Sequence, residues 1–308
     1  MATALLCVAA AAACGSPSDP VARPTSSTSA PSTSATPTSS AVPPGLPPTA
    51  VAAAEDGRLV VLDTATGEVL RTLRTFSDLR TEAPEGGHSA PRDIALTPDG
   101  TVAYLEWCCE PAAGDIRRVP TDGGGGAGEG PVANGYAPSV SPDGASVAWG
   151  TYPSGLTIRT GDQQRLVRGP EEPSDLSYNA TAWVDDRHVA YARTTPGGHV
   201  TDSRFYIHDI AAPDLLGDRL LAEARDLRDF VRRGDGSLVW AGSDGVGHVL
   251  DAGTGRETAA FELGGDVRDI AYDATGTWLL YTTQARELRW TGGGRSGAVP
   301  GRFVAAGW

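Results

Sequence analysis

The sequence contains no lysine, because all 25 of its basic side chains belong to arginine. The absence of lysine excludes the phosphate-binding loop GxxxxGK[ST], in which a lysine contacts the phosphate oxygens. The formal net charge of -13 also argues against a surface that follows a nucleic-acid backbone. Such binding draws most of its affinity from cationic side chains. We therefore expect no nucleic-acid partner.

Motifs for several kinds of active site are also missing. No GxSxG segment supplies the exposed serine of an α/β-hydrolase. The histidines are His88, His188, His199, His208 and His248. No two of them stand at the short spacing that a zinc site on one helix or hairpin needs. The motifs thus predict no catalytic residue, no metal ligand and no cofactor.

The amino terminus has an apolar run that is too short to span a membrane. Residues 1–13 read MATALLCVAAAAA, whereas a membrane-spanning helix needs about 20 residues. The run matches the apolar core of a signal peptide. It ends in three alanines followed by Cys14, which resembles the lipobox of bacterial lipoproteins. That resemblance implies cleavage before Cys14, lipidation of Cys14, and anchoring to the outer face of the cytoplasmic membrane by the lipid alone.

An ordinary secretory signal cut after Ala13 is the alternative interpretation, and both interpretations export the mature protein. The segment 14–49 that follows is almost wholly Ser, Thr, Pro and Ala. Such a composition buries too little apolar area to offset chain entropy. We expect a disordered tether over 14–49 and a folded domain over 50–308.

The folded domain repeats one phrase, a strand followed by a tight turn and a second strand. The turns fall at Asp99, Asp143, Asp185, Asp235 and Thr275. Their spacing of 40 to 50 residues agrees with a four-stranded propeller blade of about 40–45 residues. The SPDG and DTATG phrases resemble the TolB, WD40-like and YVTN groups of β-propellers. This resemblance implies an all-β propeller and implies no particular activity.

Counting the repeats predicts six four-stranded blades, with the ring closed by the carboxyl terminus. Residues 301–308 (GRFVAAGW) align with 267–273 (VRDIAYD), which places Arg302 opposite Arg268. We expect the last strand to pair into the first blade, because closure removes exposed strand edges. A frayed tail is the alternative. Residues 214–233 also fit a helix, so one helical turn and an outer strand over DRLLAEA both remain open there.

The first positions of the innermost strands are the candidate ligand-binding residues, because these strands begin at the mouth of the central channel. The set is Arg92, Asp93, Tyr136, Tyr178, Asn179, Arg228, Asp229, Arg268, Asp269 and Arg302. Convergent polar groups around a concavity suggest a binding site. Ion pairing between neighbouring blades is the structural alternative.

Cys108 and Cys109 are the only two thiols in the expected mature domain apart from the lipidated one. In an oxidising compartment they fit a disulfide between adjacent residues that stiffens a loop, and two free thiols are the alternative.

These features favour a monomeric cell-surface lipoprotein whose propeller is a non-catalytic binding or scaffold module for a protein, a glycan or another cell-envelope component. An extracellular propeller hydrolase or lactonase is one alternative, which carboxylates clustered at the channel mouth would favour. An extracytoplasmic sensor or transport accessory is another.

Overall fold

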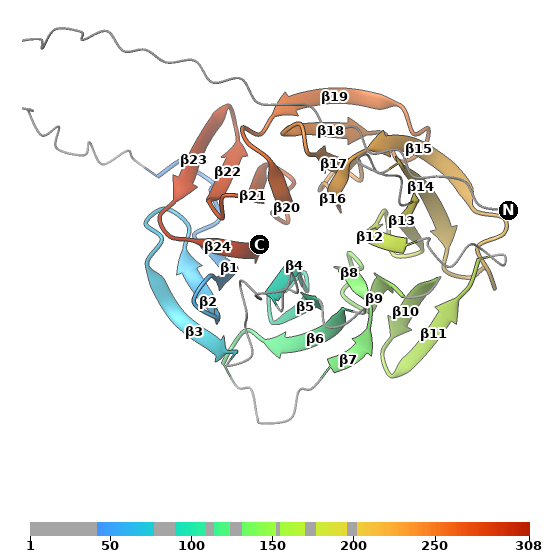
Figure 1. The fold of residues 1–308 in the computed structure, drawn as a ribbon, viewed down its shortest axis with the longest axis horizontal. Helices are drawn as coiled ribbons and strands as arrows, with labels where there is room; N and C mark the ends of the chain where they lie inside the picture. The colour runs from blue at the N-terminus through green and yellow to red at the C-terminus, as the bar shows by residue number, and fades with distance from the viewer. Residues whose placement is uncertain are drawn as a thin grey trace, which may run out of the picture. The chain divides into compact units, whose positions relative to one another are not determined.

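The computed structural model describes residues 42–76, 90–108, 114–123, 131–151, 155–169, 177–195 and 202–308. Within these ranges every regular element is a β-strand, and the strands form six sheets of four antiparallel strands each. The sheets follow one another around a ring (Figure 1). The predicted all-β, six-bladed propeller is confirmed.

The sheets are numbered here as blades in chain order. Blade 1 comprises β24 (Phe303–Gly307), β1 (Thr49–Ala54), β2 (Arg58–Asp63) and β3 (Val69–Thr75). Blade 2 comprises β4 (Ala90–Leu96), β5 (Val102–Cys108), β6 (Asp115–Pro120) and β7 (Pro131–Asn134). Blade 3 comprises β8 (Tyr136–Val140), β9 (Ser146–Gly150), β10 (Leu156–Thr160) and β11 (Gln163–Val167).

Blade 4 comprises β12 (Ser177–Trp183), β13 (His188–Thr195), β14 (Asp202–Asp209) and β15 (Arg219–Arg225). Blade 5 comprises β16 (Leu227–Arg232), β17 (Leu238–Gly242), β18 (Val246–Leu250) and β19 (Glu257–Glu262). Blade 6 comprises β20 (Val267–Tyr272), β21 (Trp278–Thr283), β22 (Leu288–Gly292) and β23 (Arg295–Val299). The first-named strand of each blade lies nearest the ring axis and the last-named at the periphery (Figure 1).

The closing strand β24 completes blade 1 as predicted. It pairs antiparallel to β1, with Ala53 opposite Ala305. All five residues of β24 are buried, and Phe303 packs in one apolar cluster with Trp278 of blade 6. Because β24 completes the sheet that β1 begins, the first and last strands of the propeller lie in one blade.

The core lies between neighbouring blades, where the inner strands bury both faces. Every residue of β9, β17 and β21 is buried. Trp183 and Tyr191 of blade 4, each 1% exposed, share a cluster with Leu156 of blade 3. Burying a large apolar side chain contributes roughly 1.5–3 kcal/mol. The strong apolar content of these strands therefore holds each blade against the next.

The repeated turn phrases close the hairpins between the first two strands of a blade. In the turn after β8, Asp143 accepts hydrogen bonds from the Ser141 hydroxyl at 2.6 Å and from the Ala145 N–H at 2.9 Å. Gly144 follows at a φ of 73°, a conformation that residues with a Cβ rarely adopt. An aspartate followed by glycine is thus what this turn requires.

The ambiguous segment 214–233 is strand and turn. All of DRLLAEA after Asp218 falls in β15, the outer strand of blade 4, and the segment continues into β16. No helix occurs there, so the outer-strand interpretation is confirmed. At the other end of the domain, Leu46 is 7% exposed and packs in the cluster with Trp278, so the ordered domain includes residues before β1.

Candidate functional site

A β-bulge recurs near the start of the innermost strands. In β4, β12, β16 and β20 one residue stands outside the paired register, and these residues are Arg92, Asn179, Arg228 and Arg268. A bulge leaves its extra residue unpaired and re-aims its side chain. Four of the residues predicted from the sequence therefore share one backbone feature.

The alignment of Arg302 with Arg268 is wrong. In the closing strand the residue outside the register is Val304, and Arg302 precedes the strand. The predicted alignment matched Arg302 with Arg268 because both residues are arginine. The antiparallel pairing of β24 with β1 fixes the actual register. Arg302 instead forms an ion pair with Glu55, which also pairs with Arg286.

The aspartates that follow the bulge hold neighbouring blades together. Asp229 Oδ2 accepts the backbone N–H of Ile270 in blade 6 at 2.8 Å. Asp269 Oδ2 accepts the backbone N–H of Ala306 in blade 1 at 2.9 Å. Each carboxyl group thus ties its own inner strand to the inner strand of the following blade, across three successive blades.

Glu106 belongs to the same site and was not predicted. It stands on β5 directly opposite Asp93, is 6% exposed, and accepts the backbone N–H of Ala137 at 2.8 Å. Like charges at directly opposite positions are destabilising. An acidic residue inside the apolar strand TVAYLEW, next to a strand carrying Asp93, was the signal in the sequence that could have revealed it.

The carboxyl groups near the ring axis influence one another's pKa values. They belong to Asp93, Glu106, Asp229 and Asp269. Burial raises the pKa of Asp93 well above its usual value, and the nearby charges of Asp229, Asp269 and Glu106 raise it further. Burial raises the pKa of Asp229 to about 6. Burial also raises the pKa values of Asp269 and Glu106. These groups therefore hold their protons to a higher pH than exposed carboxyl groups do.

Asp229 and Asp269 affect each other's pKa: Asp229 raises the pKa of Asp269, and Asp269 lowers that of Asp229. Asp269 is 1% exposed, and its buried Oδ1 accepts no hydrogen bond from the described residues. Two acids that influence each other in this way titrate as a pair.

The predicted arginines divide into two groups. The Nε of Arg228 lies 3.7 Å from Oδ1 of Asp266, the residue before the next blade's first strand. Both side chains are substantially exposed. Arg268 is half-buried, and its Nη2 donates to the carbonyl oxygen of Pro91 at 3.4 Å. Burial lowers the pKa of Arg268, and the nearby Arg92 guanidinium lowers it further. Arg92 itself is exposed.

We call the six residues that meet at the axis the axial cluster. It consists of Arg92, Asp93, Glu106, Asp229, Arg268 and Asp269. Of the other predicted residues, Tyr136 is half-buried on β8, and Tyr178 and Asn179 lie on β12 with their side chains outside the description. Cys108 ends β5 and its side chain is likewise not described, while Cys109 lies outside the described residues.

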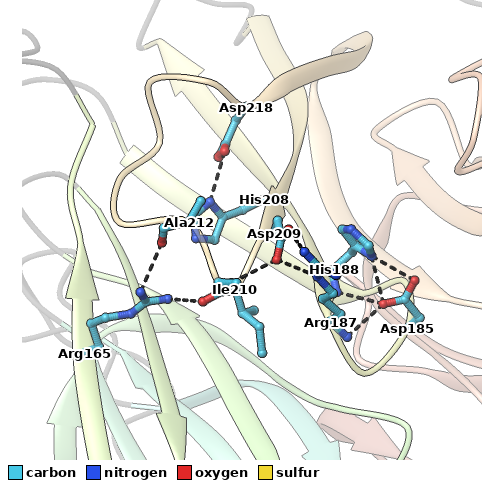
Figure 2. Close-up of polar contacts among 10 residues, drawn as sticks. Arg165, Asp185, Arg187, His188, His208, Asp209, Ile210, Ala212 and Asp218 are labelled. Atoms are coloured by element: carbon cyan, nitrogen blue, oxygen red, sulfur yellow. Dashed lines mark hydrogen bonds and ion pairs between the residues drawn. The ribbon is translucent and has the colours of Figure 1, made fainter.

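A second polar cluster lies in blade 4 and at its contact with blade 3 (Figure 2). The Nδ1 of His208 lies 3.0 Å from Asp218, which also accepts the Tyr191 hydroxyl at 2.9 Å. Both His208 and Asp218 have buried side chains. Arg165 of β11 donates to the carbonyl oxygens of Ile210 and Ala212. These contacts fix the turn that leads into β15, which is a structural role.

Two further kinds of feature are absent from the part of the chain that the structure describes. Among the described residues, no three histidine, cysteine, aspartate or glutamate side chains are grouped so as to hold a metal ion. In the same part of the chain, no helix has the length and apolar character needed to cross a bilayer.

Two solved structures resemble this chain. The β-propeller domain of Cps50 (Swd1) from Myceliophteria thermophila has a TM-score of 0.51 at 14% identity, and the match covers 82% of each chain. Hydrazine synthase from Kuenenia stuttgartiensis has a TM-score of 0.50 at 16% identity, covering 82% of this chain and 79% of that one. No family model and no curated protein matches the sequence. The structural likeness therefore shows the β-propeller fold alone.

Proposed function

We propose that the protein is an exported lipoprotein that presents its β-propeller outside the membrane as a non-catalytic binding or scaffold module. The lipobox-like residues before Cys14 and the Ser/Thr/Pro-rich segment 14–49 support the anchor and the tether. The axial cluster supports the binding role, because it gathers two guanidinium groups and four carboxyl groups from three blades. Its ligand is a protein, a glycan or another cell-envelope component.

The contacts of the buried carboxyl groups favour binding over catalysis. Asp229, Asp269 and Glu106 are 1–7% exposed, and each accepts a backbone N–H from the following blade. A catalytic acid must reach the reacting atoms. Groups that are buried and already hydrogen-bonded to the backbone serve the architecture of the ring.

One observation favours the second candidate function, an extracellular propeller hydrolase. Carboxyl groups gather at the axis, as a hydrolytic site would require. The two carboxyl groups of most glycosidases flank the scissile bond at about 5–10 Å, however. Asp229 and Asp269 are buried and hydrogen-bonded to the backbone of the following blade, so neither carboxyl group is free to flank such a bond.

Metabolic labelling tests the anchor. We would express the full chain in a bacterial host with a labelled fatty acid, beside a Cys14→Ala variant. We expect label and membrane association in the wild type, loss of both in the variant, and digestion of the wild-type propeller by protease added to intact cells. An unlabelled wild-type protein, or one protected from protease in intact cells, would contradict the proposal.

The same preparation separates binding from hydrolysis. The wild type and an Asp229→Asn variant would be incubated with chromogenic ester, lactone and glycoside substrates. We expect equal background rates from both proteins. Turnover by the wild type that Asp229→Asn abolishes would favour the hydrolase.

A further inference from the structure

Two guanidinium groups meet at the axial cluster from blades that are not neighbours. Arg92 belongs to β4 of blade 2 and Arg268 to β20 of blade 6, while β24 of blade 1 contacts both strands. The Nη2 of Arg268 donates to the carbonyl oxygen of Pro91, the residue before Arg92. The Arg268 guanidinium group of blade 6 therefore reaches the backbone of blade 2 one residue before Arg92.

These two arginines have no ion pair of their own among the described residues, unlike the other two arginines of the predicted set. Arg228 pairs with Asp266, and Arg302 pairs with Glu55. Arg92 is exposed, and its charge works against that of Arg268. Two like charges held this close raise the free energy of the site, and an anion placed between them would lower it.

The neighbouring acids do not supply that anion. Asp269 and Glu106 are buried and turned to the backbone of the next blade. Asp93 is half-buried, and burial together with the charges of the neighbouring acids raises its pKa. The charges of Asp269 and Glu106 act on Arg268, but among the described residues neither carboxyl group forms an ion pair with Arg92 or Arg268, and each accepts a backbone N–H instead.

We propose that Arg92 and Arg268 together bind an oxyanion, a carboxylate or a phosphate group carried by the ligand of this propeller. The proposal rests on the binding function proposed above and names the chemistry of its ligand. The planar guanidinium fork matches both kinds of oxyanion through paired hydrogen bonds. The overall charge of -13 gives no general attraction for anions, so such binding would depend on this local pair.

Calorimetric titration of the full chain with three related sugars tests the proposal. Galacturonate carries a carboxylate, galactose 1-phosphate carries a phosphate, and galactose carries neither. We expect saturable binding of at least one charged sugar at low salt, weakening as salt rises to about 150 mM, and no binding of galactose. The two charged sugars decide which oxyanion the site takes.

The variants are Arg92→Gln and Arg268→Gln, with Arg228→Gln as the matched control. Arg228 holds the equivalent bulge position in blade 5 but is paired with Asp266. Losing one charge-assisted hydrogen bond is worth about 1.5–3 kcal/mol, so each of the first two variants should weaken binding by roughly ten- to a hundredfold. The control should bind as the wild type does. Arg92 is exposed, so its variant keeps the test valid if Arg268→Gln does not fold.

Three results would overturn the oxyanion site. These are no binding of either charged sugar by the wild type, equal binding of galactose, or equal weakening by Arg228→Gln. None of them bears on lipidation at Cys14, which the labelling experiment measures separately. Conversely, an unlabelled protein that still binds a charged sugar through Arg92 would refute the anchor and support the site.

Discussion

The carboxyl group of Asp269 joins blade 6 to blade 1, because its Oδ2 accepts the backbone N–H of Ala306 at 2.9 Å. Asp229 makes the equivalent bond one blade earlier, to Ile270. The residues closest to the axis thus hold the ring together at the strands beside its closure. The same arrangement concentrates carboxyl groups where two arginines converge.

Two substitutions of Asp269 separate its hydrogen bond to Ala306 from its interaction with Asp229. Asp269→Ala removes the acceptor of the Ala306 N–H and should lower the free energy of unfolding by about 1–3 kcal/mol. Asp269→Asn keeps a carbonyl acceptor and supplies an amide donor toward Asp229, so its effect should be clearly smaller. Denaturant titration of both variants at pH 7 measures the difference. Equal losses would show that the bond to Ala306 does not stabilise the ring.

Stability should fall as the pH rises from 5 to 8. The folded-state pKa of Asp229 is raised to about 6, and those of Asp93 and Asp269 are raised well above their usual values. The folded protein therefore binds more protons than the unfolded chain in this window. For each extra proton that the folded protein binds, the free energy of unfolding falls by about 1.4 kcal/mol per pH unit. The fall continues over the pH range in which the folded and unfolded states differ in bound protons.

The turn aspartates, such as Asp143 and Asp235, have lowered pKa values and contribute only near and below about pH 4, so they do not mask this slope. Melting temperatures across the window would measure it. We expect a shallower slope in Asp269→Asn. A melting temperature that rises with pH would contradict the raised pKa values.

The closing strand should carry much of the stability of blade 1. Phe303 is 4% exposed, and Phe303→Ala should cost about 3–5 kcal/mol through the lost contacts and the cavity left behind. Val69→Ala on the peripheral strand β3, where Val69 is 38% exposed, is the control and should stay within about 0.5 kcal/mol. Denaturant unfolding compares the two variants. Similar losses would mean that β24 is loosely held.

Buried polar contacts in blade 4 should contribute more to the free energy of unfolding than exposed ones do. Tyr191→Phe removes the hydroxyl that donates to the buried Asp218 and should cost about 1 kcal/mol. Arg187 pairs with Asp209 at the exposed rim, so Arg187→Gln should cost at most about 1 kcal/mol and less at high salt. Thermal melting at two salt concentrations distinguishes them. A larger salt-dependent loss for Tyr191→Phe would contradict a structural role for the buried cluster.

The fold was predictable because its information is local and repeated. Each SPDG-type phrase fixes a hairpin through an aspartate acceptor and a glycine at positive φ, as at Asp143 and Gly144. The period then fixes the number of blades. Residues 214–233 stayed open at the level of sequence because they also fit a helix, and the structure places the outer strand β15 there.

The site was predictable only in part. The sequence indicated Arg92, Arg268 and the aspartates that follow the bulges, because these positions recur. Glu106 was missed because it occurs in one blade only, and its partner Ala137 lies in the next. The reach of Arg268 to Pro91 depends on how blades 6 and 2 approach each other around blade 1, which no local pattern records. Arg302 was misaligned because the repeat does not reveal the bulge at Val304.

Amide hydrogen exchange of residues 303–307 tests the central claim that the last strand seals the ring. The account predicts protection as strong as that of β20 and β16, with exchange only when the whole propeller opens, because β24 is fully buried and bonded to β1. Asp269→Ala should lower that protection first at Ala306. Complete exchange of residues 303–307 within seconds in the wild type would contradict closure of the ring by β24.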